Sequence, residues 1–101
     1  MASRLDLQKK LEELLGNRNV YYQPPSNISM SYPAIKYAKN KITSKHANDK
    51  IYGSRIQYTL TIIDRKPDNP VIAKLLELPY CSYDRNYKSD NLEHDVLAIY
   101  Y

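Results

Sequence analysis

Cys81, His46 and His94 are the residues of this chain that could take part in nucleophilic catalysis. The thiol of Cys81 would need one of the two histidines as its base, and a nucleophile and its base must lie within hydrogen-bond reach. Nothing in the sequence places either histidine beside Cys81. Because a buried cysteine is usually inert, we interpret Cys81 as a small filler of a β-hairpin and predict that the chain is not an enzyme.

Metal and cofactor chemistry is also poorly supported by the sequence. His94 stands between Glu93 and Asp95, but neighbouring side chains on a strand point to opposite faces, so the carboxylates would point away from the imidazole. The two glycines, Gly16 and Gly53, do not form a phosphate-binding loop. We therefore predict no catalytic residue, no metal site and no cofactor.

The segment from Lys36 to Arg55 carries most of the excess positive charge and a single acid, Asp49. Its basic residues are Lys36, Lys39, Lys41, Lys45, Lys50 and Arg55. In one interpretation these residues form a solvated hairpin whose lysines discourage edge-to-edge aggregation. In the other they contact an acidic neighbour or the phosphates of a nucleic acid, without base readout, because no aromatic ladder accompanies them. These six residues are the predicted partner interface.

Two helices are expected to support this segment, one at about residues 3–15 and one from Pro70 to just before Pro79. In the first helix four leucines recur at spacings of three and four, which places them on one stripe. These are Leu7, Leu11, Leu14 and Leu15. Ser3 is predicted to cap this helix and Gly16 to end it.

The β-prone runs predict a short strand at residues 20–23, a long hairpin and a terminal hairpin within residues 80–101. The long hairpin rises through residues 34–43, where apolar residues first alternate with polar ones and then Lys39 and Lys41 occupy the same expected face. A strand that loses its apolar face while it stays β-prone is expected to project beyond the body of the domain. The sequence thus predicts a projecting β-hairpin.

The order of these elements does not alternate between strand and helix, so a parallel sheet is not required. We predict the α+β class, with a mostly antiparallel sheet and two helices packed on one face. The chain has 101 residues and is 43% hydrophobic, which predicts a single domain spanning residues 1–101.

Composition also limits where the protein acts. A lone cysteine excludes an intrachain disulfide, no charged and apolar leader opens the chain, and no apolar run approaches a membrane span. We therefore expect a protein that folds in a reducing cytoplasm and has no membrane partner. The formal net charge of +4 is modest beside that of dedicated nucleic-acid binders.

Several segments of the chain, taken together and in order, carry a family resemblance. They are residues 20–25 (Val-Tyr-Tyr-Gln-Pro-Pro), 30–35 (Met-Ser-Tyr-Pro-Ala-Ile), 58–64 (Tyr-Thr-Leu-Thr-Ile-Ile-Asp), 84–87 (Asp-Arg-Asn-Tyr), 90–96 (Asp-Asn-Leu-Glu-His-Asp-Val) and the final Tyr100-Tyr101. Through them the chain resembles the small minor capsid or tail terminator (tail completion) proteins of long-tailed bacteriophages. The similarity covers nearly the whole chain.

This resemblance implies a structural virion protein with a compact α+β fold. Such a protein would form a hexameric ring on the head-proximal end of the tail tube, stop tube polymerisation and join the tail to the head connector. The implied partners are other copies of the chain, the tail tube protein and the connector protein, with possible contact to DNA in the lumen. The implied location is the virion, after assembly in the cytoplasm of the host bacterium.

Two alternatives to the tail terminator remain open at this point. The resemblance also admits a head-completion protein, acting as a connector or stopper on the portal side. The basic segment admits a small nucleic-acid-binding module, whose affinity would fall steeply with salt.

Overall fold

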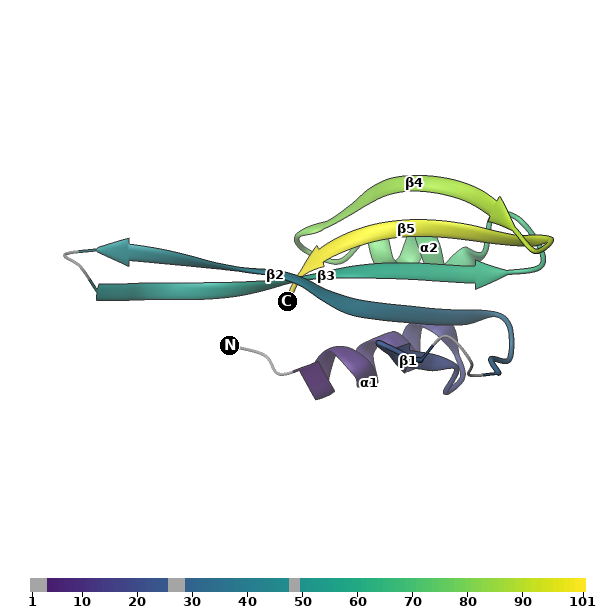
Figure 1. The fold of residues 1–101 in the computed structure, drawn as a ribbon, viewed down its shortest axis with the longest axis horizontal. Coiled ribbons are helices and arrows are strands. Elements are labelled where there is room, and N and C mark those ends of the chain that lie inside the picture. Colours follow the sequence, from purple (N-terminus) through teal and green to yellow (C-terminus); the bar gives the residue numbers. More distant parts are fainter. Residues whose placement is uncertain (1–3, 26–28, 48–49) are drawn as a thin grey trace.

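The structure is a computed structural model that describes residues 4–25, 29–47 and 50–101, and for residues 41–47 and 50–55 it describes the backbone alone. Its helices and strands do not alternate regularly as in a βαβ fold, and the sequence predicts this (Figure 1). In chain order they are α1 (Arg4–Leu15), β1 (Val20–Tyr22), β2 (Ala34–Ala47), β3 (Lys50–Asp64), α2 (Pro70–Leu76), β4 (Cys81–Ser89) and β5 (Leu92–Tyr100).

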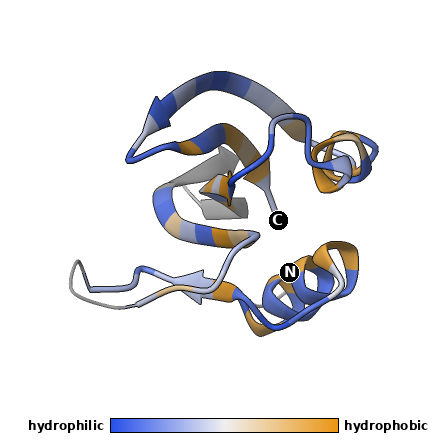
Figure 2. Cartoon of the chain, turned by 90° about the vertical axis from the view of Figure 1, so that its right-hand side faces the viewer, coloured by the Kyte–Doolittle hydropathy of each residue, from blue (hydrophilic) through white to orange (hydrophobic). Residues whose placement is uncertain are grey.

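All the strands belong to one sheet with the order β1-β2-β3-β5-β4. The short pair β1–β2 is parallel, and the other three pairs are antiparallel, so the predicted α+β fold with a mostly antiparallel sheet is confirmed. Both helices lie on the same side of the sheet (Figure 2). We call the sheet surface under them the helix side and the opposite surface the helix-free face.

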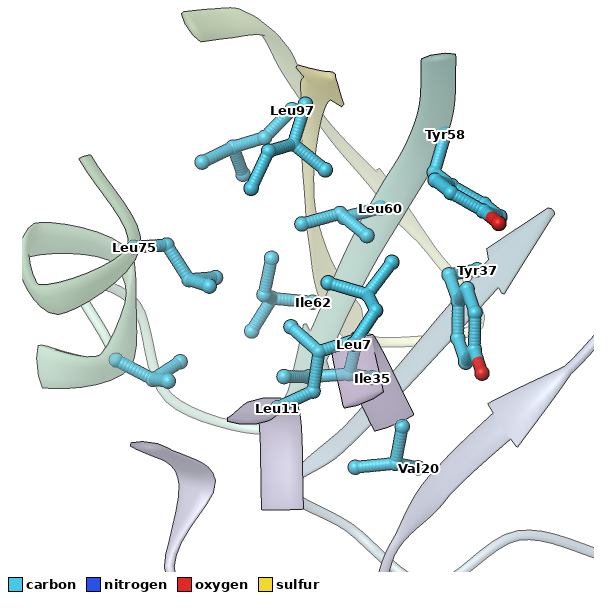
Figure 3. Packing of buried hydrophobic residues seen from close by; sticks show 12 residues of the cluster. Leu7, Leu11, Val20, Ile35, Tyr37, Tyr58, Leu60, Ile62, Leu75 and Leu97 are labelled. Carbon is cyan, nitrogen blue, oxygen red and sulfur yellow. The ribbon is translucent and has the colours of Figure 1, made fainter. Parts of the chain in front are cut away.

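The core lies between the helices and the helix side of the sheet (Figure 3). The leucine stripe of α1 supplies Leu7 and Leu11, and α2 supplies Val71 and Leu75. The strands add the buried side chains of Val20, Ile35, Tyr37, Tyr58, Leu60, Ile62, Leu97 and Ile99. Removing this apolar surface from water is the main favourable contribution to folding.

The helix boundaries have local causes. Gly16 has φ 86°, a left-handed conformation that glycine adopts without strain, and its amide donates to the carbonyl of Glu12 at 2.9 Å. Pro70 opens α2 behind Asn69, whose side-chain oxygen accepts a hydrogen bond from the amide of Val71 at 2.9 Å. The predicted Gly16 stop and Pro70 start are confirmed, whereas Ser3 lies outside the described residues.

The predicted terminal hairpin is formed by β4 and β5, which a tight turn joins. The turn residues Asp90 and Asn91 have φ 53° and 61°, as a two-residue type I′ turn requires. β5 lies between β3 and β4, and three consecutive residues of it, Asp95 to Leu97, are buried. The last strand of the chain is therefore an interior strand of the sheet.

The β2–β3 hairpin extends well beyond the rest of the molecule (Figure 1). β5 ends where Tyr100 pairs with Gln57, and β1 ends where Tyr22 pairs with Tyr37. Past these points β2 and β3 pair only with each other. We call the strand segments 41–47 and 50–55 the arm. It gives the molecule an extent of 51 Å against 28 and 23 Å in the other directions.

Candidate interaction surface

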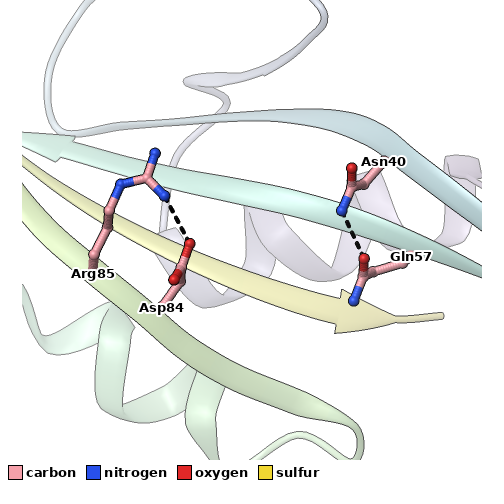
Figure 4. Close-up of polar contacts among 4 residues, drawn as sticks. All are labelled: Asn40, Gln57, Asp84 and Arg85. Atoms are coloured by element: carbon pink, nitrogen blue, oxygen red, sulfur yellow. Dashed lines mark hydrogen bonds and ion pairs between the residues drawn. The ribbon is translucent and has the colours of Figure 1, made fainter.

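The arm departs from the body at a β-bulge. Lys39 pairs with Tyr58 and Lys41 pairs with Gln57, so Asn40 is the extra residue. The Asn40 amide Nδ2 donates to the Gln57 Oε1 at 2.7 Å across the two strands (Figure 4). A bulge adds one residue to one strand, and it therefore reverses the facing of every later residue relative to simple alternation.

This reversal corrects one expectation. Simple alternation puts Lys39 and Lys41 on the same face, but the register puts Lys39 opposite Tyr58 on the helix side and Lys41 opposite Gln57 on the helix-free face. Ile56 packs against the core, so it is on the helix side. Its partner Ile42 therefore also occupies a helix-side position. The bulge therefore separates two lysines that the sequence pattern had placed together.

The register assigns the other predicted interface residues as well. Lys36 pairs with Thr61, Arg55 with Thr43 and Lys45 with Gly53, and alternation puts these pairs on the helix-free face. A second register shift follows, in which Tyr52 is the extra residue on β3, and it leaves the pair of Lys50 and Ala47 on the same face. Of the six residues, the structure describes the side chains of Lys36 and Lys39 and only the backbone positions of the other four. Five of the six cations thus share one face, and Lys39 is the exception.

A shallow hollow of about 290 Å³ adjoins Lys36 on the body. It is lined by Gln23, Pro24, Lys36, Tyr37, Ala38, Thr59 and Thr61. The wall offers hydrogen-bonding groups from Gln23, Lys36 and the two threonines, although the larger part of its exposed surface is apolar. It continues the basic face of the arm onto the body.

The helix side of the arm's base is held by a tyrosine cluster. The Tyr37 ring lies 4.9 Å from the Tyr22 ring and 5.9 Å from the Tyr58 ring. The Tyr37 hydroxyl donates to the Gln8 Oε1 at 2.5 Å, and the Arg4 guanidinium lies over the Tyr22 ring at 4.3 Å. These contacts fix β2 and β3 to α1 immediately before the arm begins.

Burial affects the ionisation of this cluster. It raises the pKa of Tyr37 by desolvating the phenolate, although the hydrogen bond and positive charge of Arg4 oppose the shift. The pKa of Tyr58 is raised for the same main reason. Both hydroxyls therefore stay protonated and neutral through the physiological pH range.

Of the candidate nucleophile and bases, the described pair, Cys81 and His94, does not come together. Cys81 pairs with Ile99 and packs against the core on the helix side, where burial raises the pKa of its thiol. His94 stacks on its pairing partner Tyr87, with the ring centroids 4.6 Å apart. On β5 it lies five residues from Ile99, the partner of Cys81, a separation of about 17 Å at the usual rise per residue. The side chain of His46 lies outside the described part of the chain.

A polar network that the sequence did not reveal joins β4 to β5. Asp95 is 9% exposed, and its Oδ1 accepts hydrogen bonds from the Tyr83 hydroxyl at 2.6 Å and from the Asn86 Nδ2 at 3.0 Å. The bond to Asp95 is the main cause that raises the pKa of Tyr83 to about 12. The nearby Asp84–Arg85 ion pair at 2.9 Å (Figure 4) is exposed and contributes little to stability.

The comparisons with known proteins give no family. No protein-family model matches the chain, and no curated protein matches it. None of the helices in the described part of the chain is long and apolar enough to cross a membrane.

Proposed function

We propose that the chain is a structural protein of a long-tailed bacteriophage, a ring-forming subunit that caps the head-proximal end of the tail tube. The ring would stop tube polymerisation and join the tail to the head connector. The feature that carries this proposal is the arm, a two-stranded projection from a well-packed body. The resemblance of the sequence to tail terminator proteins supports the same function.

The arm is suited to a contact with another subunit because its two strands pair only with each other. The Tyr101 amide still donates to the Ile56 carbonyl at 3.1 Å, but within the arm the outer edges of β2 and β3 pair with no other strand and can pair with a neighbour. A ring needs one surface of each subunit to fit a different surface of the next, repeated around an axis until it closes. In the proposed ring the arm supplies one of these two surfaces.

The body contributes the rigidity that such a ring requires. α1 and α2 are packed on the sheet through fully buried leucines, and the Tyr22–Tyr37–Tyr58 cluster anchors the base of the arm. A rigid base defines the direction of the arm, so that successive subunits are added at the same angle.

Shortening the arm tests this proposal. Replacing residues 44–54 by Asn-Gly keeps the Thr43–Arg55 pair and closes it with a two-residue turn of the favoured type. We expect the shortened protein to fold, because the described part of the deleted segment pairs only within the arm, but to lose ring formation and tube capping. Sedimentation velocity measures the rings, and electron microscopy of the protein mixed with its tail tubes measures capping.

The matched control replaces Asp90-Asn91, the turn of the β4–β5 hairpin at the other end of the sheet, by Asn-Gly. This change keeps a type I′ turn and leaves the arm intact, so rings and capped tubes should persist. Normal rings and capped tubes from the shortened variant would contradict the role of the arm. Failure of the unaltered protein to bind tube ends would contradict the proposed function itself.

A further inference from the structure

The cations of the arm share one face because of two register shifts, the bulge at Asn40 and the extra residue Tyr52 on β3. By register, Lys41, Lys45, Lys50 and Arg55 all belong to the helix-free face. Alternate residues of a strand lie about 7 Å apart on the same face, so these positions form a row along both strands. The row continues onto the body at Lys36.

This face has almost no compensating acid. Among the described strand positions it carries six basic residues, the five above and Arg85, and one acid, Asp84, which pairs with Arg85. That is an excess of five basic residues on one face, whereas the whole chain has 15 basic and 11 acidic residues, an excess of four. The rest of the molecule is therefore close to neutral.

The remaining residues on this face indicate the kind of partner. Protein interfaces are depleted of lysine and enriched in aromatic and apolar side chains, but the arm positions of this face hold three lysines, one arginine, Thr43, Ala47 and Gly53. Lysine and threonine side chains are common donors to phosphate oxygens. This composition favours a phosphate backbone over an acidic protein surface.

The shape of the arm favours duplex DNA among the nucleic acids. A two-stranded β-ribbon fits the major groove of B-form DNA, whereas the deep and narrow major groove of duplex RNA does not admit it. Binding to single strands usually relies on aromatic residues on which bases stack. None of the paired arm positions on this face is aromatic, and the arm's one tyrosine, Tyr52, is the unpaired residue of the second register shift. We propose that the helix-free face of the arm binds the phosphate backbone of double-stranded DNA without sequence preference.

The test compares two pairs of substitutions with the same change in charge on opposite sides of the sheet. Lys41→Glu with Lys45→Glu alters the helix-free face, whereas Lys39→Glu with Lys88→Glu alters positions whose partners, Tyr58 and Glu93, belong to the helix side. Fluorescence anisotropy of a labelled DNA duplex of arbitrary sequence measures binding. Titrations at several salt concentrations between roughly 50 and 200 mM give the salt dependence.

We expect the unaltered protein to bind the duplex with an affinity that falls steeply as salt rises. The Lys41/Lys45 variant should lose at least about tenfold in affinity, and its slope against the logarithm of salt concentration should be smaller by about two. The Lys39/Lys88 variant should lose much less. Circular dichroism confirms folding, and a milder Lys41→Gln, Lys45→Gln variant should show a smaller loss in the same direction.

Several results would overturn the inference. One is that the unaltered protein shows no salt-dependent binding. Another is that the two charge variants lose the same amount of DNA affinity. A third is that the protein binds single-stranded DNA or duplex RNA more tightly than duplex DNA. Displacement of the duplex by polyglutamate at equal charge concentration would assign the face to acidic proteins instead.

The inference does not depend on the proposed ring, since binding is measured on the purified subunit. Tube capping by the same variants separates the two proposals. The Lys41/Lys45 variant should still cap tubes, and a loss of capping would identify this face as a protein contact.

Discussion

Tyrosine provides all the aromatic side chains of this protein, which has 11 tyrosines and neither phenylalanine nor tryptophan. Each buried ring therefore brings a hydroxyl, and an unsatisfied buried hydroxyl is costly. Tyr37 is 1% exposed and satisfies this requirement through Gln8, whose own Nε2 donates to the Val20 carbonyl at 3.0 Å. No buried side-chain nitrogen or oxygen in the described residues lacks a partner.

Tyr83→Phe tests the network around Asp95. The change removes the 2.6 Å bond from the hydroxyl to the carboxylate, so we expect a loss of about 1 kcal/mol in the free energy of unfolding near neutral pH. Urea denaturation measures the loss. Tyr87→Phe, which keeps the ring that stacks on His94, is the matched control and should change stability little.

The pH dependence of that loss has a defined sign. The pKa of Tyr83 rises from 10.0 to about 12 in the folded protein, so the folded state favours the protonated hydroxyl. The stabilisation is fully present below about pH 10 and is lost as the pH rises towards 12. The difference between the unaltered protein and Tyr83→Phe should therefore shrink over this interval, and a constant difference would argue against the network.

At the scale of the elements, α2 has seven residues and depends strongly on its first turn. Asn69 both caps the helix at the Val71 amide and donates from Nδ2 to the Asp64 Oδ2 at 2.7 Å. Asn69→Ala should lower the free energy of unfolding by about 1 kcal/mol through the lost cap.

Asn69→Ser separates the two roles of this residue. Both substitutions remove the amide donor to Asp64, but serine keeps an oxygen that can cap the helix. The serine variant should therefore be the more stable in thermal or urea denaturation. Equal stability of the two variants would show that the bond to Asp64 matters and the cap does not.

The elements were largely predictable because their signals are local. The leucine spacing with Gly16 defined α1, Pro70 and Pro79 bracketed α2, and the alternation at the start of residues 34–43 indicated β2. The place of β5 inside the sheet was not predicted, although its continuous apolar run from Val96 to Ile99 is typical of a strand buried on both faces. Its pairing with β3 is a contact distant in sequence that no local pattern specifies.

The candidate surface was predictable in its residues but not in its geometry. The lysines were visible in the sequence, but their faces depend on the bulge at Asn40 and on the second register shift at Tyr52. A bulge between polar residues such as Lys39 and Lys41 leaves no break in an apolar pattern, so it has no sequence signal there. The Asp95 network was missed for a related reason, because Tyr83 and Asp95 come together only through the register of the hairpin.

At the scale of the whole molecule, the arm makes the protein longer than its chain length requires. The radius of gyration is 14.7 Å, whereas a compact domain of this size has about 13 Å. In small-angle X-ray scattering of monomers, the variant in which Asn-Gly replaces residues 44–54 should approach about 12 Å, the value for a compact chain of its length. An unchanged radius would mean that the arm does not extend from the body in solution.

The interior position of β5 also has a consequence for synthesis. Leu97 and Ile99 are buried in the core, and β4 joins the sheet only through β5. A growing polypeptide therefore cannot complete its core until the codons for these residues have been translated and the segment has left the ribosome. A premature stop codon that removes β5 would leave the apolar faces of α1, α2 and β3 open to water, so the truncated product should aggregate or be degraded.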